Sequence, residues 1–509
     1  MSHFPYLTVL TAAPLVGAAG IAFLPKDKPE LAKRVSLAWS VVVLALTVGL
    51  WAQFDANGER FQLKDSWTWI PQWGAKFTFA IDGIALVMIA LIALLVPLVI
   101  LASWHDADHS KRSVPAYFAL LLALECTMIG VFAAQDVFLF YVFFEVMLVP
   151  MYFLIGSYGG HQKQYAAVKF FLYSLLGGLF MLAAVVGLWV VGGHTFDWQA
   201  LVNADFSVNT ERWLFLGFFV AFAIKAPFFP FHTWLPDAGG AAPAGAAALL
   251  VGVLDKVGTF GILRYCLPLF PNASKYFAWL GLTLALVGII YGALVAIGQQ
   301  DLKRLVSYTS IAHFGFIGIG IFAFTTQAGT GSVLYMVNHG LATGLLFLVV
   351  GMLVARRGSA LVTDFGGAGK TLPILAGVLF IAGLASLALP GTSPFISEFL
   401  VLIGTFTVNK TVAVIATAGI ILAAGYVLWM IQRTTQGTPN PKLAEIKAMG
   451  RDLSLREAVV VAPLIALILL LGFYPKPVID VINPAVKATM QDVGKTDPKA
   501  TAGTVEAGK

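Results

Sequence analysis

Long runs of apolar residues, separated by short polar segments, dominate the pattern of this chain. A helix needs about 20 apolar residues to cross the roughly 30 Å hydrocarbon core of a bilayer. The pattern therefore predicts an all-α polytopic membrane protein with about 14 transmembrane helices, and the alternation typical of barrel strands is absent. The predicted spans are 4–24, 35–54, 81–104, 114–134, 137–157, 165–192, 213–233, 243–267, 276–298, 305–325, 331–355, 372–407, 411–432 and 455–474.

Two of these spans contain closely spaced prolines. The seventh carries KAPFFP at 225–230, and the twelfth carries LPGTSP at 389–394. Proline donates no backbone hydrogen bond and clashes with the preceding turn, so both helices are predicted to be broken. Because the breaks are five helices apart, we expect an inverted five-helix repeat, with helices 4–8 related to helices 9–13.

The repeat predicts five parts of the chain. These are helices 1–3 (1–113), the first repeat (114–270), the second repeat (271–435), an inner loop with helix 14 (436–475) and a polar C-terminal tail (476–509). The tail offers few apolar positions and is expected to be mobile. The first span has no basic segment before it and is expected to be a retained helix, not a signal peptide.

Basic residues are concentrated in alternate loops, which predicts the topology. With the N-terminus on the outer side, the outer loops hold only Arg60, Lys64, Lys76, Arg212, Lys275 and Lys410, apart from the lysines of the tail. The inner loops hold Lys26, Lys28, Lys33, Arg34, Lys111, Arg112, Lys163, Lys303, Arg304, Arg356, Arg357, Lys370, Arg433, Lys442, Lys447, Arg451 and Arg456. This bias predicts that both termini lie outside.

Composition excludes several function classes. The chain is 59% hydrophobic and 11% charged, whereas soluble domains carry about 25% charge. Its net charge of +6 reflects membrane topology, and no basic stripe with interleaved aromatics indicates a nucleic-acid partner. The two cysteines, Cys126 and Cys266, lie in different predicted helices, so neither a disulfide framework nor a protein-held iron–sulfur cluster is expected.

Charged residues inside the predicted helices are the candidate functional groups. A charge at the centre of a bilayer costs roughly 2.5–3.5 kcal/mol even on the lenient insertion scale, and such residues usually mark ion or proton pathways. Four of them stand in apolar surroundings: Glu145, Lys225, Lys256 and Glu398. Each has a structural alternative, namely an ion pair that holds helices together or, for Lys225, a side chain that reaches the inner surface.

Neighbouring residues extend this set. Asp255 adjoins Lys256 but projects about 100° away around a helix, so their pairing is left open. His313 and His339 are candidate proton relays because imidazole titrates near neutral pH, although either could be a packing residue. Glu125 is a weaker candidate of the same kind, and Arg264 is expected to be a structural anchor.

The motifs around these residues resemble those of the antiporter-like subunits of respiratory complex I. They are FFEVMLVPM at 143–151, KAPFFPFHTWLPDA at 225–238, DLKRLVSYTSIAHFG at 301–315, NHG at 338–340 and LPGTSPFISEF at 389–399. The likeness runs over nearly the whole chain. Glu398 stands where sister subunits usually have lysine, which favours the NuoM-type subgroup, the counterpart of mitochondrial subunit 4.

The resemblance implies a proton-translocating subunit in the membrane arm of NADH:quinone oxidoreductase. Glu145, Lys225, Lys256, His339 and Glu398 fall on the family's translocation residues. FMN, iron–sulfur clusters and quinone would lie in other subunits, with neither cofactor nor metal in this chain. Its partners would be other membrane subunits, including NuoL-type and NuoN-type neighbours, in a bacterial plasma membrane.

In the mechanism that we expect, Glu145 holds Lys225 charged, and their separation drives a proton to Lys256. The proton then leaves through His313, His339 and Glu398. Two alternatives stay open. The same motifs occur in multisubunit Na⁺/H⁺ antiporters and membrane-bound hydrogenases, and the subunit could be a structural spacer that moves no proton.

Overall fold

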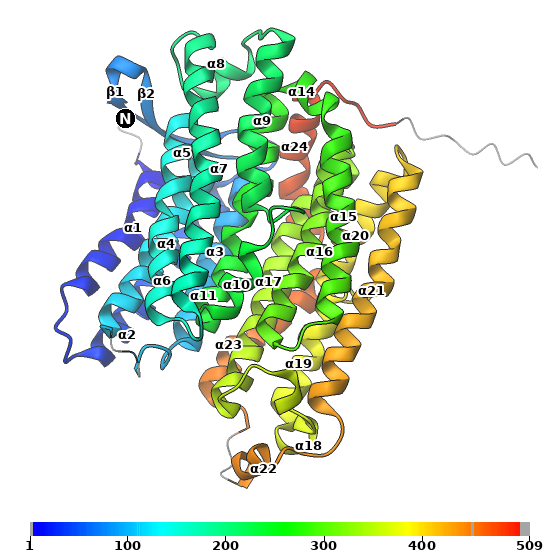
Figure 1. The fold of residues 1–509 in the computed structure, drawn as a ribbon. Coiled ribbons are helices and arrows are strands. Elements are labelled where there is room, and N and C mark those ends of the chain that lie inside the picture. Colours follow the sequence, from blue (N-terminus) through cyan, green and yellow to red (C-terminus); the bar gives the residue numbers. More distant parts are fainter. Residues whose placement is uncertain (1–3, 109, 111, 449–451, 499–509) are drawn as a thin grey trace, which may run out of the picture.

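The computed structural model describes residues 4–108, 110, 112–448 and 452–498. Lys111, Arg451 and the last part of the predicted tail, 499–509, lie outside the described residues, as does the side chain of Lys447. The molecule is a bundle of long helices that run between two ends, with a small hairpin at one of them (Figure 1).

The N-terminal half consists of α1 (Tyr6–Ala22), α2 (Pro29–Gln53), β1 (Gln62–Ile70), η1 (Pro71–Trp73), β2 (Ala75–Ile81), α3 (Gly83–Ala102), α4 (Val114–Ala133), α5 (Val137–Val146), α6 (Leu148–Tyr158), α7 (Lys163–Val191), α8 (Trp198–Val202), α9 (Val208–Lys225), α10 (Trp234–Ala241), α11 (Ala244–Leu249), η2 (Leu250–Leu254), α12 (Lys256–Gly261), η3 (Ile262–Cys266), α13 (Leu267–Leu269) and α14 (Pro271–Tyr276). The C-terminal half consists of α15 (Ala278–Ile297), α16 (Leu302–Phe322), α17 (Thr326–Arg357), η4 (Val362–Asp364), α18 (Ala368–Thr371), α19 (Pro373–Ser386), α20 (Ser393–Phe406), α21 (Lys410–Thr435), α22 (Pro441–Ala448), α23 (Leu455–Phe473) and α24 (Lys476–Asp492).

Every predicted span coincides with one or two helices or with a run of helical segments, so the all-α membrane class is confirmed. Among the described residues, eleven helices are long and apolar enough to cross a membrane, and three further apolar helices are shorter: Tyr6–Ala22, Pro373–Ser386 and Ser393–Phe406. The total of fourteen spans and the inverted repeat stay predictions.

Both predicted helix breaks are present. Helix α9 ends at Lys225, and α10 begins only at Trp234, after the two prolines. Helix α19 ends at Ser386 and α20 begins at Ser393; between them, Gly391 adopts a φ of 95° that favours glycine. A third interruption separates α5 from α6 at Met147, because Pro150 has no N–H to continue the hydrogen-bond ladder.

Central helices cover the two breaks. In α3, α16 and α17 nearly all residues are buried, whereas α7, α15 and α21 bury only one side. Figure 1 shows α17 and α16 in the middle of the bundle, with α1 and α2 at one margin and α21 at the other. Lys225 and Glu398, the charged residues of the two broken helices, therefore lie within the protein.

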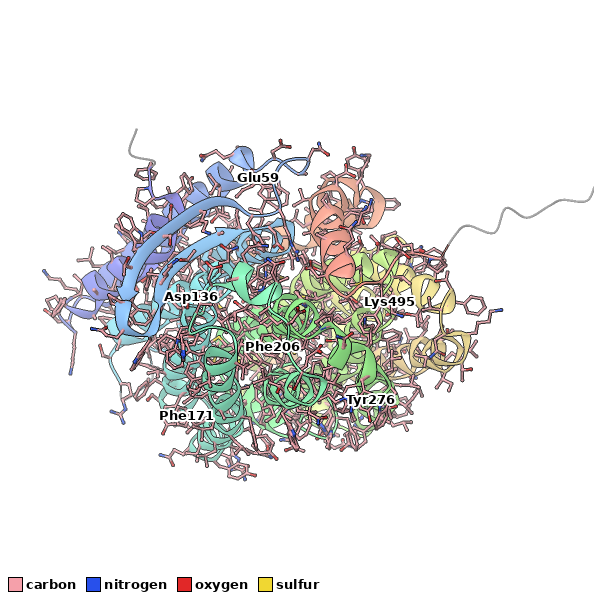
Figure 2. All side chains as sticks on the ribbon, turned by 90° about the horizontal axis from the view of Figure 1, so that it is seen from above. Glu59, Asp136, Phe171, Phe206, Tyr276 and Lys495 are labelled. Carbon is pink, nitrogen blue, oxygen red and sulfur yellow. The ribbon has the colours of Figure 1, made fainter. Side chains whose placement is uncertain are left out.

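Strands β1 and β2 form an antiparallel hairpin that the hydrophobic pattern did not predict. The hairpin lies across one end of the bundle, where it arcs over the N-terminal helices in the view from above (Figure 2). Side chains fix it there: Asp65 Oδ2 accepts from the Thr8 backbone N–H at 2.8 Å, and Asp136 Oδ2 accepts from the Lys76 N–H at 3.0 Å.

The expectation that the tail over 476–509 has little to pack is wrong for its first half. Residues Lys476–Asp492 form α24, whose buried side, including Ile482, Val486 and Met490, packs on α17 and α3. Arg60, just before β1, joins the C-terminal end of α24 to the hairpin through an ion pair with Asp492 at 2.6 Å. The sequence signal for α24 was a set of apolar residues at helical spacing within a segment of polar composition.

Candidate functional site

Lys256 lies in the middle of the bundle, at the point where a π-helical turn ends. In the π turn η2 the Asp255 N–H bonds to Leu250 O, five residues back, at 3.1 Å. Val251 O is thereby left for another donor, and the Lys256 ammonium donates to it. The irregular backbone thus provides a carbonyl ligand for a fully buried cation, as π turns at functional sites often do.

Asp255 and His339 complete the surroundings of Lys256. The distance from Lys256 Nζ to Asp255 Oδ1 is 3.2 Å, so the pairing that the sequence left open is formed. The second carboxylate oxygen of Asp255 has no hydrogen-bond partner among the described residues. From α17, His339 Nδ1 approaches Lys256 Nζ to 2.6 Å.

The two histidines lead from Lys256 toward the second broken helix. The ring centroids of His339 and His313 are 5.1 Å apart. His313 Nε2 lies 3.2 Å from the hydroxyl of Tyr426 on α21. Its ring also lies 5.9 Å, centroid to centroid, from that of Tyr335. Both histidines are enclosed by protein.

Glu398 lies at the far end of this group, on the second helical turn after the break. Its Oε2 accepts a hydrogen bond from the Tyr335 hydroxyl at 2.9 Å, and its side chain is buried. Asn338 fixes the start of α20 because its Nδ2 donates to Ser393 O at 2.7 Å. Tyr335 and His339 are four residues apart on α17, so they share a face of the helix.

Glu145 and Lys225 lie in the N-terminal half. Glu145 is at the end of α5, and its carboxylate packs against Gly178 of α7, where a side chain would collide with it. The ammonium of Lys225 is buried and lies 5.2 Å from the ring centroid of Phe144 and 5.5 Å from that of Phe170. Among the described residues these two groups form no direct ion pair, and the expected role of Glu145 in holding Lys225 charged stays a prediction.

The remaining candidates occupy separate places. Glu125 is fully buried on α4 and neither oxygen has a hydrogen-bond partner among the described residues. Arg264 is the structural anchor that the sequence indicated: its Nη2 lies 2.6 Å from Asp82 Oδ1, and Asp82 also caps α3. Neither residue touches the group around Lys256.

Three polar residues carried no sequence prediction of their own: Lys169, Asp237 and His232. Lys169 of α7 pairs with Asp237 at 2.7 Å, and Arg304 of α16 donates to the same carboxylate. His232 is buried in the first helix break, with Tyr291 edge-on at a centroid distance of 4.9 Å. The sequence signal for Lys169 was a charge inside the predicted span 165–192. The signal for His232 was a histidine between two prolines.

The chain has full-length relatives. Residues 134–423 match the family described as "NADH:quinone oxidoreductase/Mrp antiporter, TM". NADH-quinone oxidoreductase subunit M of Mycobacterium tuberculosis is 48% identical, over 98% of this chain and 96% of its own length. NADH-ubiquinone oxidoreductase chain 4 of Arabidopsis thaliana is 38% identical, over 95% of this chain and 97% of its own length.

Solved structures share the fold. A chain of respiratory complex I from Thermus thermophilus superposes with a TM-score of 0.86 at 30% identity, covering 96% of this chain and 100% of that chain. A chain of the Mrp complex from Dietzia superposes with a TM-score of 0.84 at 21% identity, covering 97% and 100% of the two chains. The second likeness is one of fold alone.

Proposed function

Because the chain belongs to the NADH:quinone oxidoreductase/Mrp antiporter family, and its full-length relatives are subunit M and chain 4, we propose that it translocates protons in the membrane arm of an NADH:quinone oxidoreductase. The observation that carries this proposal is the connected group of titratable side chains from Lys256 to Glu398. A structural spacer would have no need of such a group, since each buried charge destabilises the helix that carries it.

The second half of the proposed path follows the contacts around Lys256. Asp255 and Val251 O stabilise the ammonium, and His339 lies at hydrogen-bond distance to accept its proton. Transfer from His339 to His313 crosses a centroid distance of 5.1 Å, which ring rotation or an intervening water molecule can bridge. The proton then passes along Tyr335 or Tyr426 to Glu398.

The first half of the path supplies the proton to Lys256. Lys225 lies at the end of α9, next to the helix break, and its ammonium lies over the rings of Phe144 and Phe170. In this proposal a small movement of α5 or α9 makes or breaks the Glu145–Lys225 pair. Moving one charge against about 150 mV requires roughly 3.5 kcal/mol, which the formation of a close ion pair at low dielectric can provide.

The energy for these movements comes from other subunits. NADH, flavin, clusters and quinone belong, in this proposal, to the remainder of the complex, and NuoL-type and NuoN-type subunits flank this one. The proposed location is a bacterial plasma membrane with both termini on the outer side, which the distribution of basic residues favours.

Purification of the assembly through a tag on this subunit tests the proposal. We expect the purified complex to oxidise NADH with a quinone and, in proteoliposomes, to acidify the lumen as it does so. An assembly that exchanges Na⁺ for H⁺ without oxidising NADH would instead support the antiporter function. That alternative rests on the shared fold.

A further inference from the structure

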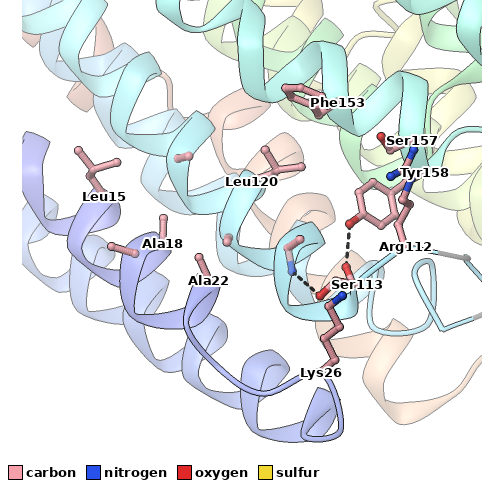
Figure 3. A pocket seen from close by; sticks show the side chains of 14 residues that line it. Leu15, Ala18, Ala22, Lys26, Arg112, Ser113, Leu120, Phe153, Ser157 and Tyr158 are labelled. Atoms are coloured by element: carbon pink, nitrogen blue, oxygen red, sulfur yellow. Dashed lines mark hydrogen bonds between the residues drawn. The ribbon is translucent and has the colours of Figure 1, made fainter.

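A groove on the surface of the helix bundle is lined by residues that take no part in the proposed proton path. It is an open groove between α1, α4 and α6 with a volume of about 680 Å³ (Figure 3). Alanines of α1 and α4 form its floor, and Leu15, Leu120 and Phe153 form apolar walls. Its volume and apolar lining suit a hydrocarbon chain, which gains free energy by burying apolar surface against protein.

One end of the groove is polar and basic. Lys26 and Arg112 approach it from the α1–α2 and α3–α4 loops, and Figure 3 shows both at the end occupied by Ser113 and Tyr158. The Tyr158 hydroxyl donates to Ser113 O at 2.7 Å, which joins the end of α6 to the start of α4. Among the described residues neither cation forms an ion pair.

A second cavity of about 440 Å³ continues from this basic end. It shares Arg112, Ser157 and Tyr158 with the groove and adds Lys163, whose Nζ donates to Ser157 O at 3.0 Å. One carboxylate, Asp106, also lines it. The basic residues at the combined end therefore outnumber the acidic one.

We propose that the α1/α4/α6 groove binds a diacyl phospholipid with an anionic headgroup, its acyl chain along Leu15, Leu120 and Phe153 and its phosphate between Lys26 and Arg112. Charge complementarity selects this occupant over a neutral lipid. Basic pockets between transmembrane helices bind anionic headgroups in this way. A bound lipid would fill the space between α1 and α6, beside the direct packing of α1 on α4.

Photo-crosslinking in the assembled complex tests the proposal. The complex is purified, depleted of lipid with mild detergent and incubated with phosphatidylglycerol that carries a diazirine in one acyl chain. The same experiment is run with the matching phosphatidylcholine probe. Mass spectrometry of the crosslinked peptides is expected to place phosphatidylglycerol adducts on α1, α4 and α6 facing the groove, at least fivefold more often than phosphatidylcholine adducts.

Two kinds of variant sharpen the test. The charge variant K26Q/R112Q is expected to reduce phosphatidylglycerol adducts at least fivefold, whereas K28Q, which alters a cation of the same loop outside the groove, should leave them unchanged. Ala19 is exposed and lines the groove, so A19F should block the acyl chain; Ala12 is exposed on the same helix outside the groove, so A12F should not.

Three results would overturn the proposal. Equal labelling by the two probes would mean a groove that takes any lipid. Absence of adducts in the wild-type complex would mean that another subunit covers this face. Unchanged phosphatidylglycerol labelling in K26Q/R112Q would show that Lys26 and Arg112 do not bind the headgroup, whatever labelling A19F gives.

Discussion

Replacement of Asp255 by asparagine is the change that most sharply separates a proton relay from a structural ion pair. The substitution keeps the shape of the side chain and one oxygen acceptor but removes the charge next to Lys256. At the observed 3.2 Å, the attraction between the two charges is about 5 kcal/mol at an effective dielectric constant of about 20. This exceeds the roughly 3.5 kcal/mol needed to move a charge against about 150 mV.

The D255N substitution should therefore stop transfer through this subunit while the rest of the complex turns over. We expect NADH oxidation to continue, with fewer protons translocated per electron. The assay measures acidification of proteoliposomes and NADH consumption in the same sample, and repeats the measurement with an uncoupler to confirm that the catalytic arm is intact.

The matched control is D82N. Asp82 also forms a buried ion pair, at 2.6 Å from Arg264, but lies outside the proposed path. Loss of one partner of a buried ion pair typically costs about 3–5 kcal/mol, so D82N should lower the yield of complex. The proton-to-electron ratio of the complex that does assemble should not change. A normal ratio in D255N would refute the reasoning and leave Asp255 as a structural counter-ion.

Three further changes test other parts of the account. Y335F removes the hydroxyl that donates to Glu398 at 2.9 Å. Because a neutral hydrogen bond contributes about 1 kcal/mol, proton translocation should slow about fivefold while the amount of assembled complex stays the same. An unchanged rate would exclude Tyr335 from the path. G178A places a methyl group in collision with the Glu145 carboxylate at the end of α5. We expect NADH oxidation with a reduced proton-to-electron ratio. A normal ratio would show that the Glu145 carboxylate tolerates displacement. V486D puts a charge into the buried side of α24, where a charge destabilises the packing. The amount of assembled complex on native gels should therefore fall severalfold. The control K487D, on the exposed side of α24, should assemble normally.

The sequence predicted the features that follow from hydrophobicity and from proline chemistry. The spans, the two broken helices and the buried charges in them all depend on local composition, so they were readable without tertiary contacts. The spacing that puts Tyr335 and His339 on one helical face is also present in the sequence, but a tyrosine in an apolar helix has no evident partner until α20 is in place.

Other features depend on long-range contacts. The π turn before Lys256 frees Val251 O, and no periodicity in 250–254 indicates it. The tail was predicted to be polar from its average composition, whereas its buried apolar residues decide that α24 folds onto α17. The contact between the Glu145 carboxylate and Gly178 depends on how α5 packs on α7, which single spans do not specify.

The proton-to-electron ratio of the complex that carries Lys256→Ala tests the central claim most directly. Lys256 is enclosed by protein and contacts three groups of the proposed path, so its removal interrupts every transfer through the middle of this subunit. The account predicts that the assembled variant oxidises NADH but loses the protons that this subunit carries. A wild-type ratio in fully assembled variant complex would contradict it and leave the subunit a structural spacer.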